Sequence, residues 1–121
     1  MKTQELSQEW IAAVNSDEKN SDENQTAIDY VMDLPYEEKF DELWEFIKYT
    51  YKQDINDKVI SVLAAGPLED LLANCGENYI KEIETLSRQE PKFRHLLGGV
   101  WQNSMSDTLW QKICKIRVTA W

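Results

Sequence analysis

Apolar residues recur three and four positions apart along most of the chain, and this spacing limits the fold more than any other feature. The clearest example is one stripe of apolar side chains: Phe40, Leu43, Trp44, Ile47 and Tyr51. Such a stripe lies on one face of a helix and faces a core. Segments in which apolar and polar residues alternate, as strands require, are few. The pattern therefore predicts an all-α protein.

Glycine and proline are rare, with four and three copies, and they fall between the apolar stripes. Proline suits the first turn of a helix, because its missing N–H has no partner there. We expect about eight short helices, with a loop over Ser16–Asn24. They span Thr3–Asn15, a segment capped by Ser21 or Asp22, Pro35–Lys52, a segment capped within Asp54–Asp57, a segment from Pro67 to Asn74, Glu77–Gln89, a segment from Pro91 and a segment capped by Ser106 and Asp107. Gly66 is expected to end the fourth helix, and Pro67 to open the fifth.

Short joints between consecutive helices predict antiparallel pairs. From Asp54 onward these pairs would resemble a fragment of an α-solenoid, and an irregular bundle is the alternative. No repeat of about 30–45 residues supports the solenoid. The 121 residues match the size of one domain and contain no linker-like stretch, so we predict a single domain over residues 1–121.

Two cysteines, Cys75 and Cys114, stand far apart, and neither belongs to a CxxC pair. Isolated cysteines of this kind are typical of reducing compartments. The first residues do not combine a basic segment with an apolar one, as a secretory signal would. No stretch approaches the roughly 18 apolar residues of a membrane span. We therefore expect a cytoplasmic protein that does not bind membranes.

Acidic residues outnumber basic ones by 22 to 13, which gives a net charge of −9. This charge repels nucleic acids and anionic membranes and favours a basic protein partner. The excess lies in the first half, because residues 1–57 hold 15 acidic and 5 basic side chains (net −10) and residues 58–121 hold 7 and 8 (net +1).

Four carboxylates concentrate this charge on the expected helix from Pro35. They are spaced at i, i+3, i+4 and i+7, and are therefore expected on one outer face: Glu38, Asp41, Glu42 and Glu45. Like charges at this spacing repel each other. One interpretation is a surface that binds a basic partner. The other is a solvated face that keeps the protein soluble.

No arrangement of residues indicates catalysis. His95 is the single histidine, no Cys/His set has metal-ligand spacing, and no glycine-rich loop follows a phosphate-binding motif. We predict no catalytic residue, no metal site and no cofactor. Trp10, Trp44 and Trp110 are expected in the core, and Trp101 either in the core or lining a groove.

Two longer motifs carry a family resemblance. They are LAAGPLEDLL at 63–72 and PKFRHLLGGVW at 91–101. Together they resemble an uncharacterised family of small bacterial domains with an AAGPLEDLL … PxFRxLLGGVW pattern, over about residues 34–117, with residues 1–33 outside. The resemblance implies a helical fold and no known activity. Five residues would form the family's shared surface or a lock between helix pairs: Glu69, Asp70, Arg94, Trp101 and Asn103.

Three functions are compatible with these features. The first is a non-catalytic interaction protein of the immunity or inhibitor type, which binds and blocks a toxin or another enzyme. The second is a scaffold or adaptor domain, in which a homo-oligomer is one possibility and the oligomeric state stays open. The third is an enzyme with a site of unrecognised type, built from Glu69, Asp70, Arg94 and His95.

Overall fold

A computed structural model describes residues 2–16, 22–102 and 105–117 of the chain. All regular elements in these ranges are helical, and the ranges contain no strand, so the all-α prediction is confirmed. The elements are α1 (Thr3–Asn15), α2 (Asp22–Asp33), α3 (Phe40–Tyr51), α4 (Asp57–Leu63), the π-helical turn η1 (Ala64–Leu68), α5 (Glu69–Gln89), α6 (Pro91–Leu97) and α7 (Asp107–Arg117). Residues 17–21 of the expected loop lie outside the described ranges.

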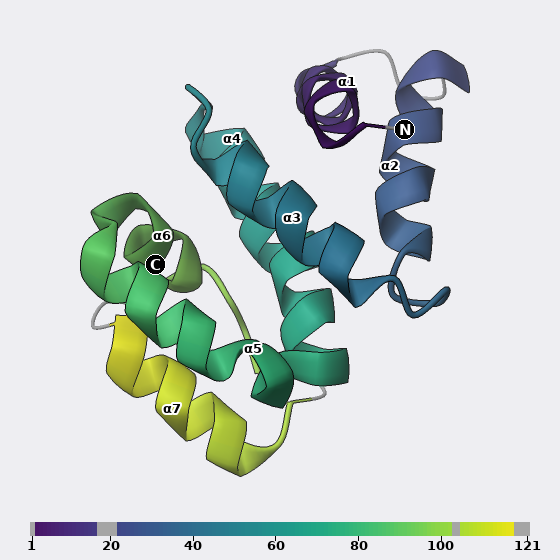
Figure 1. Ribbon diagram of the computed structural model, residues 1–121. Coiled ribbons are helices and arrows are strands. Elements are labelled where there is room, and N and C mark those ends of the chain that lie inside the picture. The colour runs from purple at the N-terminus through teal and green to yellow at the C-terminus, as the bar shows by residue number, and fades with distance from the viewer. Residues whose placement is uncertain (1, 17–21, 103–104, 118–121) are drawn as a thin grey trace.

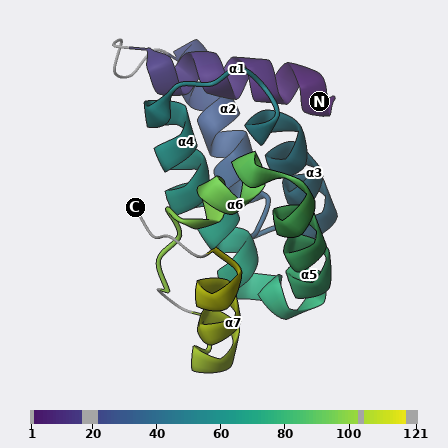
Figure 2. The same cartoon turned by 90° about the vertical axis from the view of Figure 1, so that its left-hand side faces the viewer.

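The helices form two groups that share one core (Figure 1). Helix α1 packs against α2, α3 and α4, and Figure 2 shows that it lies across the end of these three. Helix α5 packs against α6 and α7. Helix α3 contacts α5, η1 and α6, and thereby joins the two groups.

A single cluster of buried apolar side chains runs from Leu6 to Ile113. The N-terminal helix belongs to it, because the rings of Trp10 and Phe46 meet edge to face with centroids 5.4 Å apart. Beside them, the buried hydroxyls of Ser7 and Thr50 form a hydrogen bond of 2.8 Å. Residues 3–15 are therefore part of the domain, a point that the sequence leaves open.

Gly66 and Pro67 do not separate two helices, which corrects the sequence prediction. Helix α4, η1 and α5 follow one another without a break over Asp57–Gln89. Proline in an α-helix clashes with the carbonyl of residue i−4 and removes one hydrogen bond. Here the chain widens into a π-helical turn, in which the Glu69 N–H bonds to the Ala64 carbonyl, and the helix continues.

The middle of this stretch is apolar. One 18-residue window within Asp57–Gln89 has a mean hydropathy of 1.2, which by length and composition alone would suffice to cross a membrane. Half of that window is buried inside the fold. An apolar composition of this kind is expected of a helix that passes through the core of the fold.

The predicted break at residues 74–76 is a kink inside α5. Cys75 has non-helical backbone angles (φ −150°, ψ 26°), and the helix resumes after it. Next to it, a Cβ built on Gly76 would lie 2.6 Å from Leu109 Cδ2 of α7. The missing side chain of Gly76 thus lets α5 and α7 approach closely at the kink.

Helix α3 begins at Phe40 and not at Pro35, which is a second correction. Residues 34–39 form a hydrogen-bonded turn, in which Lys39 N–H donates to the Leu34 carbonyl over 2.9 Å. Glu38 adopts a left-handed conformation with φ 59°, which an α-helix does not accommodate. Leu34, only 1% exposed, anchors the turn in the core.

The remaining boundaries agree with the sequence. Helix α6 starts at Pro91, and Asn56 caps α4 by accepting a hydrogen bond of 3.0 Å from Val59 N–H. Ser106 caps α7 through the N–H of Leu109, at 3.2 Å. These caps have the residue types that favour helix N-termini.

Candidate functional site

The turn between α2 and α3 presents two apolar side chains to solvent among carboxylates. We call it the acidic corner, defined by Met32, Asp33, Tyr36, Glu37 and Glu38. Tyr36 is 87% exposed, the largest exposure among the large hydrophobic side chains that the structure describes, and Met32 is 55% exposed. The three carboxylates of the corner are all exposed. An exposed aromatic within a charged rim is typical of a binding surface.

The backbone of the acidic corner is held by its own hydrogen bonds. Glu37 N–H donates to the Asp33 carbonyl over 3.0 Å, and Glu38 N–H to the Pro35 carbonyl over 3.1 Å. One cation lies beside the corner, where Lys39 Nζ pairs with Glu37 at 2.8 Å. The carboxylates of Asp33 and Glu38 are left to define a negative surface on a fixed turn.

The four predicted partner-binding carboxylates do not share one face, which corrects the expectation from their spacing. Glu38 lies in the turn before α3 and belongs to the acidic corner. The other three lie on α3. Asp41 accepts a hydrogen bond from the Tyr79 hydroxyl of α5, and Glu42 one of 2.5 Å from Tyr30 of α2.

Glu45, the fourth carboxylate, pairs with Lys48 at 2.9 Å on the same helix. Three of the four carboxylates, Asp41, Glu42 and Glu45, therefore contact a partner side chain, on α5, α2 and α3 respectively. Asp41 and Glu42 are neighbours in sequence but contact different helices. Spacing alone does not reveal this, since their partners Tyr79 and Tyr30 lie elsewhere in the sequence.

Helix α3 and the second half of α5 run parallel, joined by a row of polar contacts that we call the α3–α5 seam. In its middle, Trp44 Nε1 donates to Glu82 over 2.8 Å, and Lys48 Nζ reaches the same carboxylate at 3.3 Å. At one end, Tyr51 donates to Glu90 over 2.5 Å. The contact of Asp41 with Tyr79 forms the other end.

The seam tyrosines are held in their neutral form. Burial, followed by the hydrogen bond to Glu90, raises the pKa of Tyr51. The pKa of Tyr79 is raised by the same two effects, with Asp41 as acceptor. In both cases an ionised phenolate would lose solvation and face a carboxylate. Sequence analysis missed this seam, and no local signal in the chain indicates it.

The family-motif residues differ in their exposure. Glu69 is buried, with 4% exposure, whereas Asp70, Arg94 and Trp101 are exposed. Trp101 is 68% exposed, which excludes the core, the first of its two predicted places. Its neighbour Val100 does fold back, with 2% exposure. Asn103 lies outside the described residues.

Three details concern the proposed lock between helix pairs. Arg88, six positions before Arg94, forms its ion pair with Glu84 on its own helix. Desolvation raises the pKa of Asp70. Arg94 lines a small pocket of about 270 Å³ together with Arg88 and Lys115. This pocket is cationic and contains neither of the motif carboxylates.

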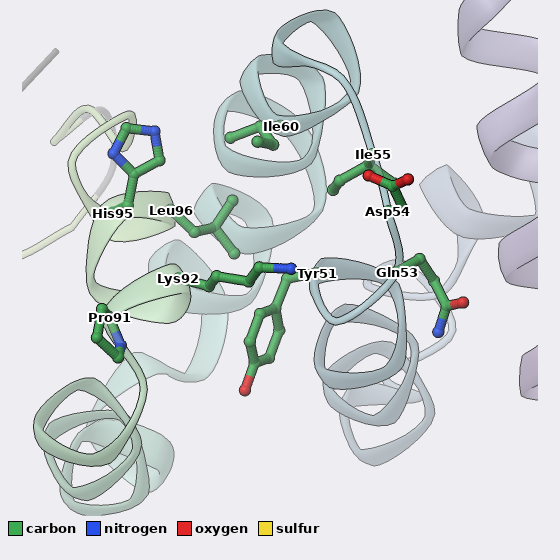
Figure 3. A pocket seen from close by; sticks show the side chains of 9 residues that line it. All are labelled: Tyr51, Gln53, Asp54, Ile55, Ile60, Pro91, Lys92, His95 and Leu96. Atoms are coloured by element: carbon green, nitrogen blue, oxygen red, sulfur yellow. The ribbon is translucent and has the colours of Figure 1, made fainter.

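His95 lines a larger pocket of about 430 Å³, shown in Figure 3. Its walls come from the end of α3, the connection before α4, α4 itself and α6. Neither Glu69 nor Asp70 is among the lining residues, so the constellation considered for an enzyme is not assembled there. Within the described ranges, no three His, Cys, Asp or Glu side chains converge as a metal-binding group.

The predicted tryptophan positions are otherwise close to the structure. Trp10 and Trp44 are each 2% exposed, and Trp110 is half-buried. Trp110 packs under the guanidinium of Arg117, whose Cζ lies 4.6 Å from the ring centroid. Arg117 also donates to the Val100 carbonyl over 2.8 Å and so ties α7 to the end of α6.

Comparison with known proteins identifies the family. Residues 14–121 match the family described as "Family of unknown function (DUF6869)", so the chain belongs to this family. The match begins at residue 14 and not at residue 34, and therefore includes α2 and the acidic corner. A search of curated proteins and a search of solved structures each found no match.

Proposed function

We propose that this protein is a non-catalytic interaction module of the immunity or inhibitor type, which binds a basic toxin or other enzyme through the acidic corner. The observation that carries the proposal is Tyr36, an aromatic side chain 87% exposed at the tip of a hydrogen-bonded turn. Large aromatic side chains dominate the energy of protein interfaces. A rigid turn loses little conformational entropy on binding.

Charge supports the choice of a basic partner. The exposed carboxylates Asp33, Glu37 and Glu38 directly follow the exposed side chains of Met32 and Tyr36 in the sequence. A negative rim attracts a positive surface before contact and raises the association rate. The proposal extends to a bacterial protein acting in the cytoplasm, and both cysteines are free, as a reducing compartment requires.

The test uses two double variants with equal net charge. Glu37→Lys/Glu38→Lys reverses the corner, and Glu5→Lys/Glu9→Lys reverses two exposed carboxylates of α1. A basic enzyme that is captured by the natural chain is purified, and its affinity, association rate and activity are measured. We expect the corner variant to lower the association rate at least tenfold, and the α1 variant to change it far less.

The variant Tyr36→Ala distinguishes the contact made by the aromatic side chain from the long-range electrostatic attraction of the partner. It should raise the dissociation rate with little effect on the association rate, because it removes an anchor without changing charge.

Inhibition of the captured enzyme at one-to-one stoichiometry supports the immunity or inhibitor type. Equal effects of both charge variants, or a partner that retains full activity in the complex, would contradict the proposal; the latter result would favour the scaffold function.

A further inference from the structure

The pocket beside His95 has the size and the lining of a small-molecule site. Its volume of about 430 Å³ falls within the range of ligand pockets, roughly 300–1,000 Å³. The lining combines residues from three consecutive regions of the fold with residues of α6, which lie about 30–45 positions further along the chain. Tertiary packing, not a local loop, therefore forms this cavity.

The walls of the pocket are mainly apolar. Figure 3 shows Ile60, Leu96 and Ile55 around its centre, with the ring of Tyr51 below them. The hydroxyl of Tyr51 is engaged by Glu90 at 2.5 Å, which fixes the ring as a wall. An apolar group of a ligand would be covered on several sides there, and burial of each methylene is favourable.

One ammonium group borders these apolar walls, that of the exposed residue Lys92. The side chain of Lys92 extends from α6 across the pocket toward Tyr51, as Figure 3 shows. Its ammonium makes no ion pair with any residue of the described ranges. The carboxylate of Asp54 lies on the opposite rim from His95. An anionic ligand is thus attracted by Lys92 and opposed by Asp54.

We propose that this pocket binds a small monocarboxylate with an unbranched apolar chain of medium length, whose carboxylate pairs with Lys92. The ammonium supplies the opposite charge, and the isoleucine and leucine walls receive the chain. A charge-assisted hydrogen bond is roughly twice as strong as one between neutral groups. The site is separate from the acidic corner and does not depend on the proposed function.

The experiment titrates the full chain with butanoate, hexanoate and octanoate, and follows backbone amide shifts by NMR. We expect saturable shifts that centre on Tyr51, Ile55 and Leu96. Affinity should rise about fourfold for each added methylene until the pocket is full. Octylamine, which has the same chain and the opposite charge, should bind far more weakly to the site.

Two variants with opposite expected signs sharpen the test. Lys92→Gln should weaken octanoate binding at least fivefold, and Asp54→Asn should strengthen it. Lys58→Gln, an exposed lysine of α4 outside the lining, is the matched control and should leave affinity unchanged. Equal binding of octylamine, shifts centred elsewhere, or no saturation by octanoate would overturn the proposal, as would a Lys92→Gln variant with unchanged affinity at intact fold.

Discussion

The acidic corner and the α3–α5 seam lie at the start and along the side of the same helix, and both are rich in carboxylates. The two regions use their carboxylates in opposite ways. In the seam, Asp41, Glu82 and Glu90 each accept a hydrogen bond from an aromatic side chain. In the acidic corner, Asp33 and Glu38 are exposed, each within three positions of the exposed Tyr36.

The difference shows how one acidic chain can hold its fold and still present a charged surface. A carboxylate that accepts from a buried tyrosine or tryptophan satisfies a donor that would otherwise be costly to bury. A carboxylate on an exposed turn contributes little to stability but sets the surface potential. Stability should therefore respond to substitutions in the seam, and binding to substitutions in the corner.

The largest expected effect comes from the ring that fills the seam. Phe93 is fully buried and packs against Trp44 and Tyr51, with centroids 5.7 and 5.2 Å away. Phe93→Ala should lower the free energy of unfolding by about 3–5 kcal/mol, measured by urea denaturation. Tyr36→Ala in the corner should change it by less than about 0.5 kcal/mol. Similar losses for both variants would abolish the distinction between the two regions.

A second effect follows from the tyrosines. The pKa of Tyr51 and that of Tyr79 are raised, and the hydrogen bond to Glu42 raises the pKa of Tyr30. The folded state thus holds these protons more tightly than the unfolded state, in which tyrosine ionises near pH 10. The associated stability is complete below about pH 10 and is lost as pH rises above it.

Absorbance at 295 nm during alkaline titration measures this directly. The three tyrosines should ionise above pH 10 and together with unfolding. In Tyr79→Phe, one of these late-ionising groups should disappear, and the free energy of unfolding should fall less steeply with pH. Ionisation of all five tyrosines near pH 10 in a folded protein would contradict the assignment.

The sequence predicts the helices well because their signals are local. Apolar spacing, Asn56 and Ser106 as caps, and Pro91 at the start of α6 all act within one or two turns. The error at the start of α3 arises where tertiary packing decides. Pro35 could begin a helix, but the burial of Leu34 holds the chain in a turn until Phe40.

The glycines illustrate the same limit. Gly66 looks like a helix end, yet a Cβ built there meets no atom within 4 Å, and the chain passes through it in a π-helical turn. Gly76, in contrast, lies against Leu109 of α7. At position 76 a larger side chain would collide with Leu109, which lies more than 30 positions further along the chain. Residue spacing does not predict such a contact. The same holds for the partners of Asp41 and Glu42.

A smaller effect is expected at the centre of the seam. Trp44 is 2% exposed, and its indole N–H depends on Glu82. Glu82→Ala removes the acceptor and should lower the free energy of unfolding by about 1 kcal/mol. Glu82→Gln keeps a carbonyl acceptor and should cost less. If the alanine variant is as stable as the natural chain, this hydrogen bond does not hold α3 to α5.

The smallest effect has the opposite sign and lies in the acidic corner. Glu38 occupies the left-handed region at φ 59°, where a side chain costs about 1–2 kcal/mol. Glu38→Gly removes this strain but increases the entropy of the unfolded chain, so a net stabilisation of about 0.5–1 kcal/mol remains. Glu38→Ala removes the same charge and keeps the strain, and it serves as the control in urea denaturation. A glycine variant no more stable than the alanine variant would show that the turn is not strained at this position. The same pair also sharpens the comparison between regions, because both variants should weaken binding of a basic partner equally while differing in stability.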